Sequence, residues 1–197
     1  MIKIGITGGI GSGKSAVCEI WQSLGAYIIN ADDIAKILMA ESAQIRQEII
    51  KAFGEKSYHS DGSLNRKFLA HQAFERDRVK ELNAIVHPYI PKQVELLMQD
   101  AEDRGVGMSV YEAALLLQNL RPDNLDYVVL VLADEEERIK RVQQRDGISR
   151  EQVTERINKQ QDFGELKHLA DVIIKNDGTF KELQQKAERL YYKFLNV

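Results

Sequence analysis

The sequence predicts an α/β fold in which helices cover a parallel sheet and a helical block interrupts the chain between the second and third strands. Three observations support this prediction. Residues 2–7 alternate like a strand and are rich in isoleucine, and a helical apolar pattern follows from residue 14. A second strand-like run at 26–29 completes a strand–helix–strand unit, which implies parallel strands. Residues 34–104 show helical periods and no convincing strand.

The early helices are predicted from apolar spacing. The face of the first helix is formed by Ala16, Val17, Ile20, Trp21 and Leu24. Gly25 then supplies a C-terminal stop. In the inserted block, an apolar stripe over 45–53 predicts a helix that Gly54 closes, and further helices are expected over 65–75 and 78–86. A last helix of the block ends before Gly105.

The core elements resume after the block. Residues 106–111 and 127–133 are strand-like, and a highly charged helix is expected over 134–145. Ser149 and Gln152 form a capping box for a helix that extends to about residue 161. Residues 171–175 give the last strand, and Thr179 with Glu182 caps the final helix.

Composition narrows the class of protein. A chain of 197 residues can hold one α/β domain with a sizeable core. Its net charge of −3 excludes a global basic surface for nucleic acid, although a local basic patch for phosphates remains possible. The single cysteine, Cys18, excludes an intramolecular disulfide and a Cys-rich metal site, and is expected to be a packing residue. With no segment of signal-peptide or transmembrane character, we expect a cytoplasmic protein with no membrane or obligate protein partner.

The motif that carries the chemistry lies between the first strand and the first helix. Residues 8–15 read Gly-Gly-Ile-Gly-Ser-Gly-Lys-Ser and match the pattern G-x-x-x-x-G-K-[ST]. Glycines allow positive φ and close approach to phosphate oxygens, while the backbone N–H groups form an anion nest at the positive end of a helix. Lys14 would contact the β and γ phosphates, and the Ser15 hydroxyl would bind Mg²⁺. The predicted ATP-binding residues here are Gly9, Gly11, Ser12, Gly13, Lys14, Ser15 and Ala16.

An acidic pair follows the second strand. Asp32 and Asp33 lie at the carboxyl edge of the expected sheet, where ligands of open parallel sheets bind. A carboxylate there could accept a proton from an attacking hydroxyl or hold Mg²⁺ through water. The alternative is that one of them caps the helix expected to start near Ile34. Catalysis is favoured for Asp32 and capping for Asp33.

Cationic side chains are dense between residues 138 and 150. The run consists of Arg138, Lys140, Arg141, Arg145 and Arg150. In a phosphoryl-transfer enzyme, arginines on a mobile segment can close over the phosphates. The equal alternative is a solvated helix face paired with glutamates 135–137.

Two other classes of site are disfavoured. The four histidines show no metal-ligand spacing. Residues 158–162 resemble a guanine-reading Asn-Lys-x-Asp motif, but they contain one residue too many and lie in a helical pattern. There is also no Asp-x-x-Gly switch, so a GTPase is disfavoured.

Taken in order along the chain, several segments resemble the dephospho-CoA kinase family. They are residues 7–15, Asn30-Ala31-Asp32, residues 61–66, His87-Pro88, residues 112–116, residues 145–150, Ala170-Asp171 and Asn176-Asp177-Gly178. The phosphate loop alone is generic, whereas the ordered set is specific and covers nearly the whole chain.

The resemblance implies a three-layer P-loop NTPase core with a parallel sheet, an inserted helical substrate domain and a helical lid. The implied core covers 1–33, 105–137 and 168–197, the CoA-side domain 34–104 and the lid 138–167. The implied reaction uses ATP and Mg²⁺ to phosphorylate the ribose 3′-hydroxyl of dephospho-CoA, which gives coenzyme A.

The resemblance also implies roles for particular residues. Asp32 would be the base or the acid that positions the hydroxyl, with Lys14 and Ser15 on the phosphates and Mg²⁺. Arg141 and Arg145 would be lid cations. Asn176 and Gly178 would lie near adenine, and Arg66 and His87 would be weaker candidates for the CoA-side pocket.

Three positions depart from the family pattern. Asn30 and Gln118 stand where the family usually has Asp and Glu, which bears on metal affinity, and Ala16 replaces a threonine with little expected effect. The alternatives are another small-metabolite or nucleoside monophosphate kinase, and a nucleotide-dependent switch without an acceptor of its own.

Overall fold

The computed structural model describes residues 1–117 and 121–196; Gln118 lies outside the described residues. It contains one five-stranded sheet with the strand order β2-β3-β1-β4-β5. The strands are β1 (Ile2–Thr7), β2 (Tyr27–Asn30), β3 (Met108–Glu112), β4 (Tyr127–Leu132) and β5 (Val172–Lys175). β1 pairs in parallel with β3 and β4, and β4 pairs in parallel with β5. The prediction of an α/β fold with a parallel sheet is confirmed.

The helices follow the predicted order with small differences in their bounds. They are α1 (Lys14–Ser23), α2 (Ala31–Glu41), α3 (Ala43–Phe53), α4 (Arg66–Ala70), α5 (Val79–Val86), α6 (Ile90–Asp103), α7 (Glu135–Asp146), α8 (Arg150–Asn158) and α9 (Phe180–Leu195). The capping boxes of Ser149 and Thr179 are both formed. Pro91 lies in the first turn of α6 and does not break it, because the first turn of a helix tolerates proline.

The chain forms two compact units. Unit 1 contains Met1–Ile29 and Met98–Val197, and unit 2 contains Asn30–Leu97. Unit 1 holds the central strands with α1, α7, α8 and α9, whereas unit 2 is built from α2 to α5 and the start of α6. The sequence-based bounds of a core, a substrate domain and a lid remain predictions.

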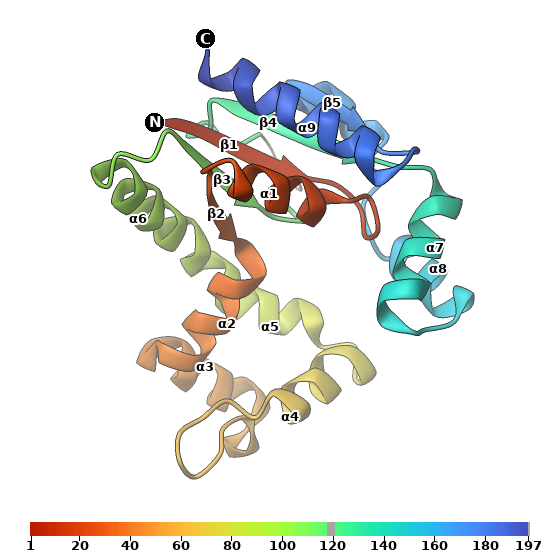
Figure 1. Ribbon diagram of the computed structural model, residues 1–197. Coiled ribbons are helices and arrows are strands. Elements are labelled where there is room, and N and C mark those ends of the chain that lie inside the picture. Colours follow the sequence, from red (N-terminus) through yellow and green to blue (C-terminus); the bar gives the residue numbers. More distant parts are fainter. Residues whose placement is uncertain (118–120, 197) are drawn as a thin grey trace. The chain divides into compact units, whose positions relative to one another are not determined.

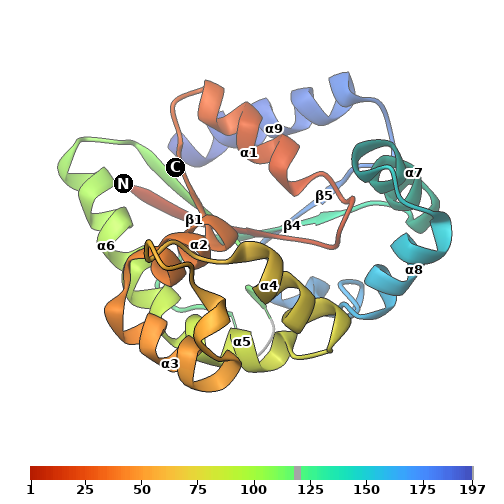
Figure 2. The ribbon, with the colours of Figure 1, turned by 90° about the horizontal axis from the view of Figure 1, so that it is seen from below.

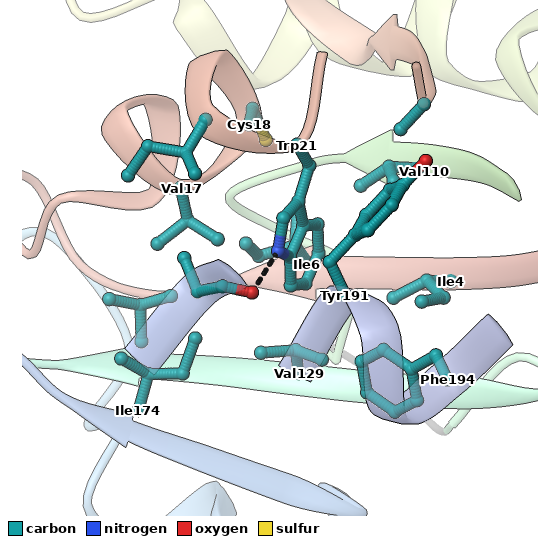
Figure 3. Close-up of a cluster of buried hydrophobic side chains, with 14 of the residues drawn as sticks. Ile4, Ile6, Val17, Cys18, Trp21, Val110, Val129, Ile174, Tyr191 and Phe194 are labelled. Carbon is teal, nitrogen blue, oxygen red and sulfur yellow. Dashed lines mark hydrogen bonds between the residues drawn. The ribbon is translucent and has the colours of Figure 1, made fainter. Parts of the chain in front are cut away.

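One face of the sheet in unit 1 is covered by α1 and α9, which lie side by side in both views (Figures 1 and 2). Ile4 and Ile6 of β1 are completely buried against these helices together with Trp21 of α1. The indole Nε1 of Trp21 donates a hydrogen bond to the backbone oxygen of Ala187 on α9, at 2.8 Å (Figure 3). Trp21 therefore joins the two helices both by apolar packing and by a directed bond.

Unit 2 has an apolar core of its own. Ile45, Ile49 and Phe53 of α3 pack with Tyr58, Leu69 and Val86. Three of these residues belong to the apolar stripe that predicted α3 from the sequence.

In the described residues, no helix is long and apolar enough to cross a membrane.

Candidate active site

The loop formed by residues 8–13 connects β1 to α1 at the carboxyl edge of the sheet. Gly11 and Gly13 have φ values of 76° and 99°, which side-chain-bearing residues rarely adopt. A Cβ atom on Gly11 would lie 2.6 Å from the backbone oxygen of Arg138, and one on Gly13 would collide with the side-chain amide of Asn176. The loop therefore needs these glycines for its conformation and for close packing against other segments.

The N-terminus of α1 has features that suit an anion site. Lys14 is the first residue of α1, with Ser15 and Ala16 in its first turn, and no side chain caps this end. The first backbone N–H groups of a helix have no partner within it, and they carry the positive end of the helix dipole. These features are the ones that the sequence interpretation requires of a phosphate site, and phosphate binding at this end of α1 stays a prediction.

Glu112, at the last position of β3, is a site residue that sequence reasoning missed. Ile6 of β1 pairs with Glu112 in the sheet, so the carboxylate lies beside the strand that enters the loop. Glu112 is buried, and its Oε1 accepts a 2.8 Å hydrogen bond from the hydroxyl of Ser15. Burial, and then the Glu112 carboxylate, raise the pKa of the nearby Cys18 thiol well above its ordinary value, so this thiol stays neutral.

The donor set suits a hard divalent cation. Mg²⁺ prefers oxygen ligands and commonly binds one or two carboxylates or hydroxyls together with substrate phosphates. The Ser15 hydroxyl, exposed beside the Glu112 carboxylate, provides such oxygens. In the part of the chain that the structure describes, no group of three His, Cys, Asp or Glu side chains forms a separate metal site.

Asn176 and Arg141 both donate hydrogen bonds to backbone oxygens of the loop. The buried Asn176 side chain donates from Nδ2 to the backbone oxygen of Ser12, at 2.8 Å. Arg141 donates to the backbone oxygens of Asn176 (2.9 Å) and Gly11 (3.4 Å). The structure thus brings both predicted site residues to the loop, where they bind its backbone. Gly178 lies two residues further on, at the surface, just before the cap of α9.

Ser12 is buried in the loop, and its Oγ has no hydrogen-bond partner within residues 1–117 and 121–196.

Two further cations of α7, Arg145 and Lys140, form surface ion pairs. Arg145 pairs with the neighbouring Asp146 at 2.7 Å, and Arg156 binds the same carboxylate. Lys140 pairs with Glu137 on the exposed face. Lys140 thus pairs with one of the glutamates at 135–137, as the second alternative for this run describes, whereas Arg145 pairs with Asp146 and Arg141 donates to the loop backbone. Closure of these arginines over the phosphates stays a prediction.

Asp32 lies in unit 2, in the first turn of α2. The interpretation that Asp32 or Asp33 caps this helix is wrong, since α2 begins at Ala31 and its cap is Asn30. Asn30 Oδ1 accepts hydrogen bonds from the backbone N–H groups of Asp32 (2.9 Å) and Asp33 (3.2 Å). The Asp32 side chain is exposed and free of a capping role, whereas Asp33 pairs with Lys36.

The structure brings a second predicted residue of unit 2 near Asp32. Partial burial lowers the pKa of His87 below its ordinary value, and the negative charge of Asp32 acts in the opposite direction. Asp32 is therefore near enough for its charge to act on the His87 imidazole. Arg66 is the first residue of α4 and is exposed.

A family model described as dephospho-CoA kinase matches residues 2–182. This chain belongs to the dephospho-CoA kinase family.

Relatives agree over nearly the full length. A dephospho-CoA kinase of Salinibacter ruber is 43% identical and one of Geobacter sulfurreducens 38% identical; the matches cover 98% and 96% of this chain and 97% of each relative. Among solved structures, a dephospho-CoA kinase from Campylobacter jejuni superposes with a TM-score of 0.68 at 28% identity, over 98% of this chain and 96% of that one. TT1252 from Thermus thermophilus gives a TM-score of 0.76 at 31% identity, over 98% and 97%. The hypothesis drawn from the ordered motifs is confirmed at the level of the dephospho-CoA kinase family.

Proposed function

We propose that the chain transfers the γ-phosphoryl group of ATP to the ribose 3′-hydroxyl of dephospho-CoA, in the cytoplasm, and releases ADP and coenzyme A. The observation that carries the proposal is the uncapped N-terminus of α1 with Lys14 in its first position and the Ser15 hydroxyl bonded to the buried Glu112. Family membership supports the choice of acceptor.

Several residues of the chain have separate roles in binding ATP. The loop amides and Lys14 bind the β and γ phosphates and stabilise the charge that spreads over the transferring group. Ser15 and Glu112 would hold Mg²⁺, which neutralises phosphate charge when it is bound with ATP. Arg141 and Asn176 keep the loop in shape through its backbone oxygens, and Asn176 with Gly178 borders the proposed adenine site.

The proposal assigns acceptor chemistry to unit 2. Asp32 takes or orients the hydroxyl proton of the acceptor, since its carboxylate has no capping role. His87 and Arg66 contribute to binding dephospho-CoA, and Arg145 acts as a cation of the lid.

A coupled ADP-release assay with dephospho-CoA beside a panel of nucleoside monophosphates tests the proposal. Among these acceptors, we expect only dephospho-CoA to be turned over, with the new phosphate on its ribose 3′-oxygen. Lys14→Ala should abolish turnover, and Asp32→Asn should keep ATP binding but slow the reaction at least about 10²-fold. Turnover of a nucleoside monophosphate in place of dephospho-CoA would refute the assignment of the acceptor.

A further inference from the structure

Both backbone polar groups of Ile10, at the tip of the phosphate loop, are bonded to side chains far away in the sequence. The Ile10 N–H donates to Oε1 of Gln160 at 2.9 Å, and the Ile10 carbonyl accepts from Nε of Arg138 at 2.9 Å. Arg138 Nη2 also donates to the same Gln160 oxygen, at 3.3 Å. The three groups close a ring of hydrogen bonds, and all of them belong to unit 1.

The packing around this ring is tight. A Cβ atom on Gly9 would lie only 2.5 Å from Arg138 Nη2, so the guanidinium lies directly against the loop backbone. The side chain of Ile10 packs on the buried cluster of Ile139, Val142 and Val153 from α7 and α8. The loop tip is therefore anchored to these helices by apolar as well as polar contacts.

The Arg138 guanidinium is half-buried among these partners. Burial lowers the pKa of Arg138, while the charges of Glu135 and Asp162 act in the opposite direction, and an arginine keeps its charge under all ordinary conditions. Holding a cation out of water is costly unless its N–H groups are bonded, so the bonds to Ile10 and Gln160 are part of what keeps Arg138 there.

We propose that Arg138 and Gln160 are positioning residues that fix the backbone of Ile10 and thereby the ring of amides that receives the phosphates. This inference rests on the proposed ATP site. Because the pair acts through the loop, its loss weakens binding of ATP and of ADP and leaves binding of dephospho-CoA unchanged. Gln160 is uncharged, so its effect separates positioning of the loop from direct attraction between a cation and phosphate.

The first arm of the test changes Gln160. Gln160→Met keeps the shape of the side chain but removes the acceptor, and we expect Mg·ADP affinity, measured by calorimetry, to fall about tenfold, the equivalent of one charge-assisted hydrogen bond. Gln160→Glu keeps an acceptor oxygen at the same place and should stay within about threefold of the parent. In steady-state assays, the KM for ATP should rise in Gln160→Met while the KM for dephospho-CoA stays constant.

The second arm is a double-mutant cycle. Arg138→Met should weaken Mg·ADP binding to a similar extent. The double variant Arg138→Met/Gln160→Met should lose little more than the worse single variant, because both side chains act on the backbone of one residue, Ile10. Lys140→Met is the matched control: it removes a cation from the same helix, but one that pairs with Glu137 at the surface. We expect it to bind Mg·ADP like the parent. If a methionine variant melts well below the parent, Arg138→Lys and Gln160→Asn repeat the cycle with smaller changes and the same expected pattern.

Two results would overturn the inference while the parent still binds Mg·ADP. One is unchanged affinity in both single variants. The other is additive losses, or an equal loss in Lys140→Met, which would indicate a general effect of charge. A parent chain that does not bind Mg·ADP at all would instead overturn the proposed function, and the inference with it.

Discussion

At the scale of single residues, the spacing of residues in the sequence predicts some members of the candidate active site and does not predict others. Lys14 and Ser15 were predictable because the loop motif fixes their places relative to the helix they begin. Glu112 follows no such spacing: any buried strand can end in an acid, and only the pairing of β3 with β1 brings this one to Ser15.

Arg141 and Arg145 also could not be told apart from the sequence. They lie four residues apart on one face of α7, so periodicity treats them alike. One helical turn displaces Arg145 by about 6 Å along the axis. Arg141 consequently reaches the loop, while Arg145 pairs with Asp146.

Glu112→Gln should raise the Mg²⁺ concentration that the reaction needs. The amide still offers Ser15 an acceptor, but it removes a negative charge from the proposed metal site. Initial rates measured against free Mg²⁺ at fixed ATP should show a half-saturating concentration higher by about tenfold, the usual scale for one lost interaction with an ion. Glu19→Gln, on the exposed side of α1, is the control and should follow the parent. An unchanged Mg²⁺ dependence in Glu112→Gln would leave Glu112 as a structural partner of Ser15 only.

Asp32→Asn should lower the pKa of His87 further. The imidazole already titrates below its ordinary range because of burial, and the Asp32 charge stabilises its protonated form. Removing that charge favours the neutral ring, which NMR titration of the His87 side-chain resonances would detect. Asp33→Asn, whose carboxylate pairs with Lys36, is the control and should shift the His87 pKa less. Equal titration curves for the Asp32 variant and the parent would mean that the Asp32 charge does not act on the His87 imidazole.

At the scale of elements, local signals predicted most helices, and the main error was at the start of α2. The boxes of Ser149 and Thr179 could be predicted because both partners lie within four residues. Asn30 was overlooked because it is at once the last residue of β2 and the cap of α2, with no loop between them. The apolar pattern begins only at the buried Ile34, so it placed the helix start too late.

Asn30→Ala should destabilise the chain, while Asn30→Asp should not. Alanine removes the oxygen that accepts from the Asp32 and Asp33 N–H groups, which costs about 1 kcal/mol at a typical N-cap, whereas aspartate is an equally good cap. Chemical denaturation followed by far-UV circular dichroism measures the difference. Equal stability of all three proteins would show that the cap contributes nothing to folding.

At the scale of the whole molecule, the sequence predicted a parallel sheet interrupted by helices but not the order of its strands. β1 lies at the centre, between β3 and β4, although it is first in the chain. Pairing between strands about a hundred residues apart produces no local sequence pattern. Periodicity therefore predicts the strands but not their order in the sheet. The ordered set of short motifs did identify the family, because it samples the whole chain.

Acid should weaken the contact that joins Asp171 to the segment of Arg121 and Val128 in unit 1. Its carboxylate accepts from the Val128 N–H at 2.7 Å and from Arg121 at 2.9 Å. Burial acts to raise the pKa of Asp171, but these two donors outweigh it and hold the pKa below its ordinary value. Since the folded chain binds this proton less readily than the unfolded chain, the stabilisation is complete above about pH 4 and is lost as the pH falls through the folded pKa.

Melting temperatures measured from pH 7 down to pH 3 check this. Asp171→Asn should melt below the parent at pH 7, and the difference should shrink on acidification below about pH 4. Asp100→Asn, which loses an exposed ion pair with Arg104, is the control and should show a much smaller difference. A constant gap between the Asp171 variant and the parent at all pH values would contradict the assignment to Asp171.

The buried indole between α1 and α9 has a practical consequence. Trp21 is the single tryptophan of the chain and belongs to unit 1. Its emission spectrum reports solvent reaching the interior of that unit. Fluorescence will therefore register unfolding of unit 1 and stay unchanged when only the block of residues 30–97 unfolds. Comparing emission with circular dichroism along one melt thus separates the two units optically, without any added label.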